Sequence, residues 1–264
     1  MKLISYRTKK FIKKLLLYPE TKVYYYHLFR KKVWNKKKVL IFAQGRTGST
    51  LLEELLCSTS HFNKRGEILG GKGTKIKFPY FYISGLVNMY SNENFIFHLK
   101  LYHLTRDRDK KIDPVSFLNK LQDDGWSFVY LKRKNKLNHY LSNKIAESRG
   151  SYHKYDKRKE NFRLSIKTQD LKRGIEERKR FETLELEALE NISYIKIVYE
   201  EDLQCQTNHQ NTVNKILDYL ELERRRGSTS MFKVNQSSQQ DIIENYNEVA
   251  SYMKENGLSE YLEQ

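Results

Sequence analysis

The stretch Val39-Leu-Ile-Phe-Ala-Gln-Gly-Arg-Thr-Gly-Ser-Thr-Leu-Leu52 decides the fold. Its first five residues are apolar and mostly β-branched or aromatic, which predicts a buried parallel strand. Two glycines then permit a tight turn. Leucines at helical spacing follow, and Ser49 or Thr50 is expected to cap that helix. The segment therefore predicts a strand, a loop and a helix in direct succession.

The loop in this segment has the composition of an anion site. Unpaired N–H groups and the positive end of the helix dipole meet at the start of such a helix. Arg46 adds a fixed cation, and the neighbouring hydroxyl side chains add donors. We therefore expect the loop to bind phosphate or a chemically similar group. The expected ligands are Gly45, Arg46, Thr47, Gly48, Ser49 and Thr50.

This loop departs from the usual nucleoside-triphosphate loop. That motif has four residues between its glycines and continues with Gly-Lys-Ser/Thr. Here only two residues separate Gly45 from Gly48, and no lysine precedes Ser49. On this segment alone, a glycine turn before an ordinary helix is the competing interpretation.

A second segment, Phe128-Val-Tyr-Leu-Lys-Arg-Lys-Asn-Lys-Leu-Asn-His-Tyr-Leu-Ser142, again predicts a strand that runs into a basic helix. Together with the first loop, its Arg133, Ser142 and following Ala146 resemble the sulfotransferases that use 3′-phosphoadenosine 5′-phosphosulfate (PAPS). The closest resemblance is to the bacterial carbohydrate sulfotransferases of the trehalose and nodulation-factor type. Their Arg-Thr-Gly-Ser-Thr loop matches residues 46–50, and their Gly-Glu pair matches residues 66–67.

The resemblance covers residues 38–264 and implies an α/β fold, with a P-loop-like central parallel sheet flanked by helices. Strands are expected near residues 39, 95, 127 and 194, and this alternation of strand and helix fits that fold. The expected organisation is a basic N-terminal arm, 1–37, followed by a single sulfotransferase domain, 38–264.

The resemblance also implies a reaction, the transfer of a sulfonate from PAPS to a hydroxyl of a carbohydrate or glycolipid acceptor without a metal. Arg46 and the loop would hold the 5′-phosphosulfate and stabilise developing charge, while Arg133 and Ser142 would hold the 3′-phosphate. Glu67 would be the general base. A late basic loop would close over the nucleotide, with Lys233 or the arginines at 224–226 as its cations.

Some roles stay open at this stage. His61 is a second candidate for the base, and Glu67 alone would otherwise be an ordinary solvated glutamate. Lys100 and His103 resemble positions near the family's acceptor pocket. The nine-residue step from Arg133 to Ser142 is one longer than in the animal cytosolic enzymes, which leaves the direction of Ser142 open.

Several element boundaries are also expected from the patterns. The third strand should span residues 95–103, and the last core strand residues 193–203, ending in Tyr-Glu-Glu-Asp-Leu. This ending is one glutamate longer than the family's Tyr-Glu-Asp-Leu. Arg133 should begin its helix, and Asp241 should cap the final helix.

The charge is concentrated at the N-terminus. Residues 1–38 hold thirteen Lys/Arg and one acid, a net charge of +12 out of the total of +17. The remainder is only mildly basic, which argues against nucleic-acid binding. The apolar residues between 3 and 16 predict a basic amphipathic helix, which either lies on an anionic membrane or packs on the core. No segment is long enough to cross a bilayer, so we expect a cytoplasmic or peripheral location.

Two alternatives belong to other classes. One is a nucleotide kinase of related fold, which lacks its loop lysine here. The other is a basic nucleic-acid-binding or membrane-binding protein that acts through the arm. Cys57 and Cys205 are too few for a disulfide framework or a metal cluster, so free thiols are expected.

Overall fold

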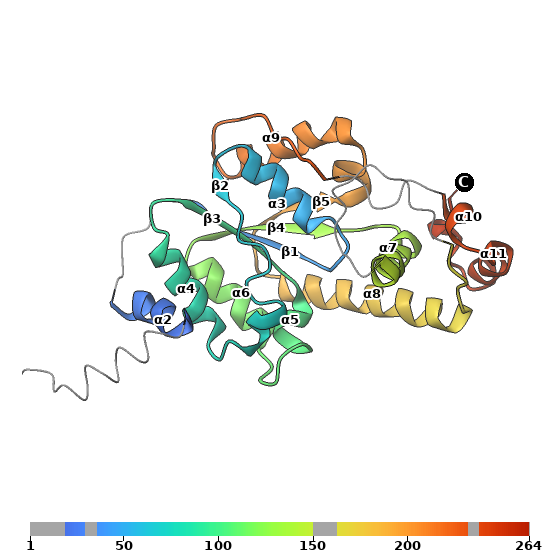
Figure 1. Ribbon diagram of the computed structural model, residues 1–264, viewed down its shortest axis with the longest axis horizontal. Helices are drawn as coiled ribbons and strands as arrows, with labels where there is room; N and C mark the ends of the chain where they lie inside the picture. The colour runs from blue at the N-terminus through green and yellow to red at the C-terminus, as the bar shows by residue number, and fades with distance from the viewer. Residues whose placement is uncertain (1–18, 30–35, 150–162, 232–237, 264) are drawn as a thin grey trace, which may run out of the picture.

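The computed structural model describes residues 19–29, 36–149, 163–231 and 238–263. At its centre lies a five-stranded, wholly parallel sheet in the order β2-β3-β1-β4-β5, shown in Figure 1. The strands are β1 (Lys38–Ala43), β2 (Phe62–Asn63), β3 (Asn94–Leu99), β4 (Trp126–Lys132) and β5 (Tyr194–Val198). The α/β fold expected from the sequence is confirmed, and its strand order is consistent with a P-loop or sulfotransferase-like architecture.

Strand β1 is the middle strand of the sheet, and both of its faces are buried. Leu40 and Phe42 point to one face of the sheet, and Val39 and Ile41 point to the other. All four are fully buried. A strand covered on both sides needs a continuous apolar run instead of an alternating one, which explains the sequence of β1.

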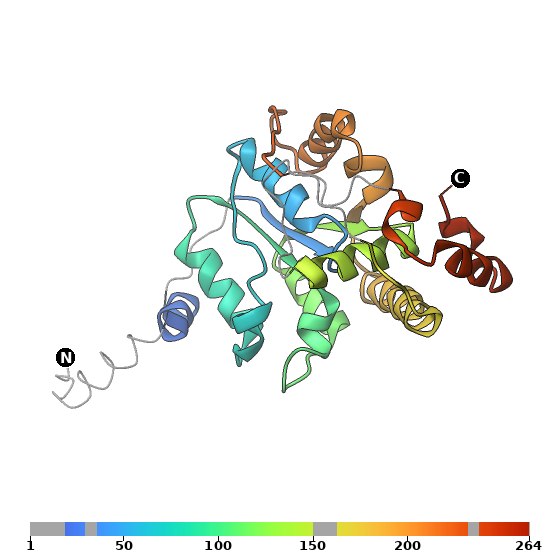
Figure 2. The same ribbon diagram turned by 45° about the vertical axis from the view of Figure 1, so that its right-hand side comes forward.

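Helices cover both faces of the sheet, so the domain has three layers (Figures 1 and 2). Helices α3 (Ser49–Ser58) and α9 (His209–Tyr219) pack on one face. The other face is covered by α4 (Pro79–Met89), α6 (Pro114–Asp123) and the end of α8 (Thr168–Ala188). The short helix α5 (Leu101–Thr105) follows β3 on that second side.

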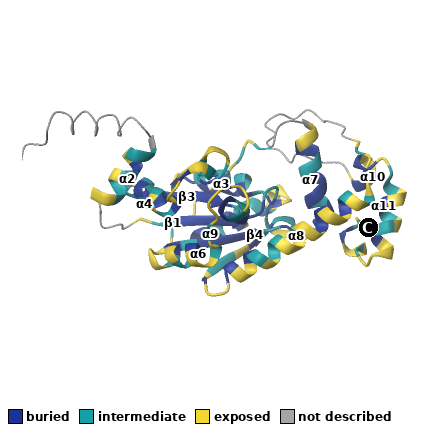
Figure 3. Ribbon diagram, turned by 90° about the horizontal axis from the view of Figure 1, so that it is seen from below, coloured by how far each residue is buried: buried dark blue, intermediate teal, exposed yellow. Residues whose placement is uncertain are grey.

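A separate apolar cluster joins the C-terminal helices to the sheet domain. Helix α7 (Lys136–Arg149) and the start of α8 pack there against α10 (Gln239–Ile242) and α11 (Tyr246–Glu255). Figure 3 shows buried strands between helices whose outer faces are exposed. The remaining short turns are η1 (Gly71–Lys75), η2 (Tyr199–Leu203), η3 (Gln206–Asn208) and η4 (Ser259–Tyr261).

The only part of residues 1–35 that the structure describes is α2 (Pro19–Phe29), which packs against α4. At the crossing, a Cβ at Gly85 would lie 2.1 Å from the carbonyl oxygen of Val23. His27 Nδ1 and Ser84 Oγ lie 2.9 Å apart at the same contact. The amphipathic helix expected between residues 3 and 16, like Lys233, lies outside the described residues.

Several expected boundaries were wrong. Strand β3 ends at Leu99, so His103 lies in helix α5 and not in a strand. Strand β5 ends at Val198, and residues 199–203 form a π-helical turn. The cap of α10 is Ser238, while Asp241 occupies the third helical position and bonds back to Ser238.

Two further expectations concern the whole chain. Cys57 and Cys205 are both free thiols, as expected. Among the described residues, no helix combines the length and apolarity that crossing a bilayer requires.

Candidate functional site

The candidate site lies where the parallel strands end. Gln44 follows β1, Lys100 follows β3, and Arg133 follows β4. Tyr199 follows β5 on the same edge. Loops at the carboxyl ends of parallel strands form the ligand crevice of open α/β sheets, so the topology gathers these side chains.

The loop between β1 and α3 takes the shape of an anion cradle. Gly48, and not Ser49 or Thr50 as expected, caps α3; it has φ +96° and no side chain to satisfy the first N–H groups of the helix. A Cβ there would approach the Tyr199 ring to 3.0 Å. Thr47 donates its hydroxyl to the Gln44 carbonyl at 2.7 Å, which closes the turn. The helix start therefore presents its N–H groups to a ligand.

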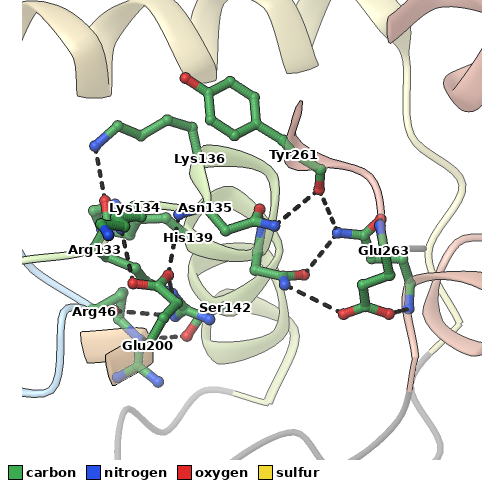
Figure 4. Close-up of polar contacts among 12 residues, drawn as sticks. Arg46, Arg133, Lys134, Asn135, Lys136, His139, Ser142, Glu200, Tyr261 and Glu263 are labelled. Carbon is green, nitrogen blue, oxygen red and sulfur yellow. Dashed lines mark hydrogen bonds and ion pairs between the residues drawn. The ribbon is translucent and has the colours of Figure 1, made fainter. Parts of the chain in front are cut away.

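Arg46 is strained within this loop, since its φ is +67° although it carries a side chain. Two contacts hold it in place, as Figure 4 shows. Its Nε donates to Ser142 Oγ at 3.3 Å, and its carbonyl accepts from a terminal nitrogen of Arg133 at 3.3 Å. The structure thus brings together three residues that the sequence singled out, and Ser142 faces the loop. Such strain is typical of functional loops.

Arg133 is 9% exposed, and its guanidinium lies 4.6 Å from the centre of the Tyr199 ring. Its Nε forms an ion pair of 3.6 Å with Glu200 but has no hydrogen-bond partner among the described residues. Burial lowers the pKa of Arg133, although arginine stays charged. Helix α7 begins at Lys136, so the expectation that Arg133 starts the helix was wrong.

The π-helical turn η2 explains how Arg133 is held. Its widened turn closes with a hydrogen bond from the N–H of Gln204 to the carbonyl of Tyr199, 2.7 Å long and five residues apart. The Glu200 carboxylate in this turn accepts from the N–H groups of Lys134 at 2.8 Å and Asn135 at 3.0 Å. Glu200 therefore ties the end of β5 to the segment that follows β4.

One side of α7 faces the loop through two residues spaced three apart, His139 and Ser142. His139 donates from Nε2 to the Gly45 carbonyl at 2.6 Å. Burial, with the nearby charges of Arg178 and Arg133, lowers the pKa of His139 well below its usual value, so the ring is neutral. The sequence analysis did not identify His139. Its spacing from Arg133 and Ser142, at steps of six and three, was the available signal.

Beneath the loop lies a buried carboxylate, Glu185 of α8. Its Oε2 accepts from Gln44 Nε2 and from the Tyr130 hydroxyl, both at 3.2 Å. Burial raises the pKa of Glu185 to about 8, and the hydrogen bonds from Gln44 and Tyr130 offset only part of that rise. The sequence analysis missed this residue as well.

Glu67 lies beside the end of β3. Its carboxylate pairs with the Lys100 ammonium, and Oε2 is 3.4 Å from His103 Nε2. Burial raises the pKa of Glu67, but His103 and Lys100 lower it more, to about 2. Lys100 also reaches the anion loop, because a Cβ at Gly45 would lie 3.7 Å from its Nζ. Glu67, Lys100 and the loop therefore form one continuous polar surface.

His61 is not part of this surface. It precedes β2, whose Phe62 pairs with Asn94 at the start of β3, so His61 lies at the opposite edge of the sheet. Its Nε2 lies 2.8 Å from the Glu223 carbonyl. The geometry gives no support to His61 as a base for a hydroxyl held near Glu67.

Two arginines of the expected late loop, Arg224 and Arg225, bind groups outside this surface. Arg224 forms two hydrogen bonds with Asp218 near the end of α9, and Arg225 binds Glu223. The pairing of Lys37, just before β1, with Glu221 places this part of the chain at the opposite edge of the sheet. Neither arginine therefore closes over the loop.

Comparison with known proteins adds no assignment to this geometry. No protein-family model matches the sequence, and no curated protein is significantly similar to it.

Proposed function

We propose that this protein is a sulfotransferase that moves a sulfonate from PAPS to a hydroxyl of a carbohydrate or glycolipid. The observation that carries the proposal is the contact of the Arg46 loop with Arg133 and Ser142. Three features meet at this contact: the start of α3, which has no side-chain cap, the strained Arg46 and the buried Arg133. The first N–H groups of α3 would meet one anionic group of the nucleotide, and Arg133 with Ser142 would meet the other.

The residues fit the donor chemically. The first N–H groups of α3 are left to a ligand because Gly48 offers no side-chain cap. The buried Nε of Arg133 has no hydrogen-bond partner among the described residues, and a phosphate oxygen would provide one. Guanidinium, hydroxyl and backbone N–H groups are the donors that phosphate and sulfonate prefer. Bound PAPS would supply the sulfonate itself.

In this proposal the chain's own residues divide the work. Arg46 and the N–H groups of α3 stabilise charge on the transferring sulfonate. Arg133 and Ser142 orient the 3′-phosphate. Glu67 accepts the proton of the acceptor hydroxyl, and Lys100, between Glu67 and the loop, holds that carboxylate beside the sulfonate.

The first prediction concerns the nucleotide. Adenosine 3′,5′-bisphosphate, the product of the reaction, should bind at least tenfold more tightly than AMP or ATP, because only it offers both anionic ends. Isothermal titration calorimetry with the three nucleotides measures this preference. Arg133→Ala should remove the preference for the 3′-phosphate, whereas Arg106→Ala, at an exposed arginine outside the site, should not. Tighter, magnesium-dependent binding of ATP would contradict the proposal and favour a kinase.

A further inference from the structure

A buried carboxylate, Glu53 of α3, supports the segment that carries Glu67. Its side chain is fully buried. Its Oε1 accepts from the N–H groups of Arg65 at 3.0 Å and Gly66 at 2.7 Å, the two residues directly before Glu67. Glu53 therefore fixes the backbone from which Glu67 projects.

Between the two carboxylates lies the imidazole of His98, on β3 and 3% exposed. Nε2 of His98 is 3.4 Å from Oε2 of Glu53, and Nδ1 is 3.7 Å from Oε1 of Glu67. The N–H of His98 also donates to the Gly66 carbonyl at 3.1 Å. The backbone and both ring nitrogens of His98 thus connect α3 with Glu67.

Both ring nitrogens of His98 face a carboxylate, so the His98 ring can hold a second proton in addition to the one that a neutral imidazole carries. A neutral imidazole has one N–H, and an N–H at Nε2 directed at Glu53 leaves the Nδ1 lone pair facing the Glu67 carboxylate. Nδ1 is buried and has no hydrogen-bond partner among the described residues, and the same is true of Oε2 of Glu53, 3.4 Å from Nε2. A buried polar atom without a partner calls for an explanation. A proton that reaches Nδ1 from the side of Glu67 would provide the missing hydrogen bond.

We propose that His98 receives the proton that Glu67 takes from the acceptor hydroxyl. This inference rests on the proposed sulfonate transfer. As the acceptor oxygen bonds to sulfur, the bond between sulfur and the nucleotide phosphate oxygen breaks, and its electron pair leaves with the nucleotide. The hydroxyl proton moves to Glu67 and then to Nδ1 of His98, and Glu53 balances the charge of the imidazolium.

The electrostatics around Glu67 make such a second acceptor useful. Its carboxylate is held ionised by His103 and Lys100, which lower its pKa to about 2 in spite of burial. A carboxylate of that kind holds a proton only briefly. The groups that face His98 are Glu53 from α3 and Glu67 from the segment after β2. Lys100 binds Oε1, the same Glu67 oxygen that faces His98, and His103 lies beside Oε2.

The proposal predicts a measurable coupling that does not depend on turnover. In ¹⁵N NMR spectra of the histidine rings, recorded at one pH, Glu67→Gln should move the Nδ1 signal of His98 and Glu53→Gln the Nε2 signal, because each substitution replaces the carboxylate that faces that nitrogen. His98→Gln assigns the signal. Glu54→Gln is the matched control, because Glu54 is adjacent on α3 and binds Thr229 and Ser230 instead. It should leave both His98 ring signals unchanged.

If Glu53→Gln does not fold, Glu67→Gln decides alone, because the Glu67 side chain is 34% exposed. An unchanged Nδ1 signal of His98 in Glu67→Gln would overturn the relay.

Kinetics provide a second readout. With radiolabelled PAPS and a panel of saccharides, His98→Gln should lower kcat roughly tenfold to a hundredfold and remove the fall in rate at low pH. The affinity for adenosine 3′,5′-bisphosphate should not change. An unaltered pH profile would contradict the relay alone. Failure of the wild type to bind the bisphosphate would contradict the sulfotransferase proposal, whatever the NMR spectra show.

Discussion

Arg46 combines a positive φ with a charged side chain, and this combination has an energetic cost of about 1 to 3 kcal/mol. The contacts with Ser142 and Arg133 hold the residue in that conformation. Arg46→Gly would relieve the strain and keep the loop, whereas Arg46→Ala keeps the strain and removes the cation. The two variants therefore separate the role of the backbone from the role of the charge.

We expect both variants to lose roughly a hundredfold or more in sulfonate transfer, because each removes a cation from the transition state. Affinity for adenosine 3′,5′-bisphosphate should fall as well. Steady-state rates and calorimetry measure the two effects. Wild-type activity in either variant would show that Arg46 does not contact the sulfonate.

Glu185 predicts a pH dependence of stability. Its pKa is about 8 in the folded protein, against 4.5 for an unperturbed glutamate, so between these values the folded state binds a proton that the unfolded state lacks. The stability that protonated Glu185 contributes to the folded state is therefore fully present below about pH 4.5. It falls as the pH rises above that value and is lost as the pH passes 8.

Glu185→Gln should flatten this dependence, because glutamine keeps an acceptor for Gln44 and Tyr130 and cannot ionise. Thermal unfolding from pH 5 to 9 should show a Tm above that of the wild type at pH 8 to 9, by roughly several degrees, and little difference at pH 5. Glu187→Gln, at an exposed position of the same helix, should follow the wild type. Parallel curves for Glu185→Gln and the wild type would refute the assignment.

Residues that follow a local pattern could be predicted, and residues defined by tertiary contact could not. Gly45, Gly48 and Arg46 stand out in the sequence because a glycine loop between strand and helix is a local signal. Glu53 looks like an ordinary helix glutamate, and its burial depends on β3 and on the segment before Glu67, which arrive later in the chain. Glu185 is hidden in the same way within a charged helix.

At the scale of elements, strand existence was predictable and strand ends were not. The apolar run of β3 continues into Leu101 and Leu104, so hydropathy alone cannot separate the strand from helix α5. At β5, the extra glutamate of Tyr-Glu-Glu-Asp-Leu belongs to a π-helical turn. A π-turn accommodates one additional residue in a helix. The side chains of residues 199–203 show no sequence pattern that predicts such a turn.

The contact of α2 with α4 depends on Gly85. Gly85→Leu should displace α2, because a Cβ there would already overlap the Val23 carbonyl. Limited proteolysis should then cleave between residues 19 and 29 at least tenfold faster than in the wild type. Binding of adenosine 3′,5′-bisphosphate should be unchanged, since the loop lies on other elements. Val115→Ala, at an exposed position of α6, is the control. Equal cleavage rates would mean that the crossing tolerates a side chain.

For the whole molecule, we propose that the basic N-terminal region binds anionic membranes. Residues 1–18 contain six Lys/Arg and no acid. Beside them in sequence, α2 exposes Leu28 (64%) and Phe29 (69%), and the neighbouring α4 exposes Phe81. Apolar side chains next to a concentration of positive charge suit a surface of acidic lipids.

Removal of residues 1–18 should abolish salt-sensitive sedimentation with phosphatidylserine vesicles, because each basic residue near such a surface contributes about 1 kcal/mol. Nucleotide affinity should stay the same, since α2 and the sheet remain. Vesicles of phosphatidylcholine are the control. Full-length protein that ignores acidic vesicles at low salt would instead favour packing of this region on the core.

The central place of β1 also constrains how the chain is made. Residues 38–42 pair with residues 95–99 on one side, and residues 38–43 pair with residues 126–131 on the other. At the usual speed of translation, the first partner emerges roughly 3 to 11 s after β1 and the second later still. Throughout that interval the most apolar strand of the sheet is a nascent segment without partners. Ribosome-bound chains shorter than about 126 residues should therefore depend most strongly on chaperones.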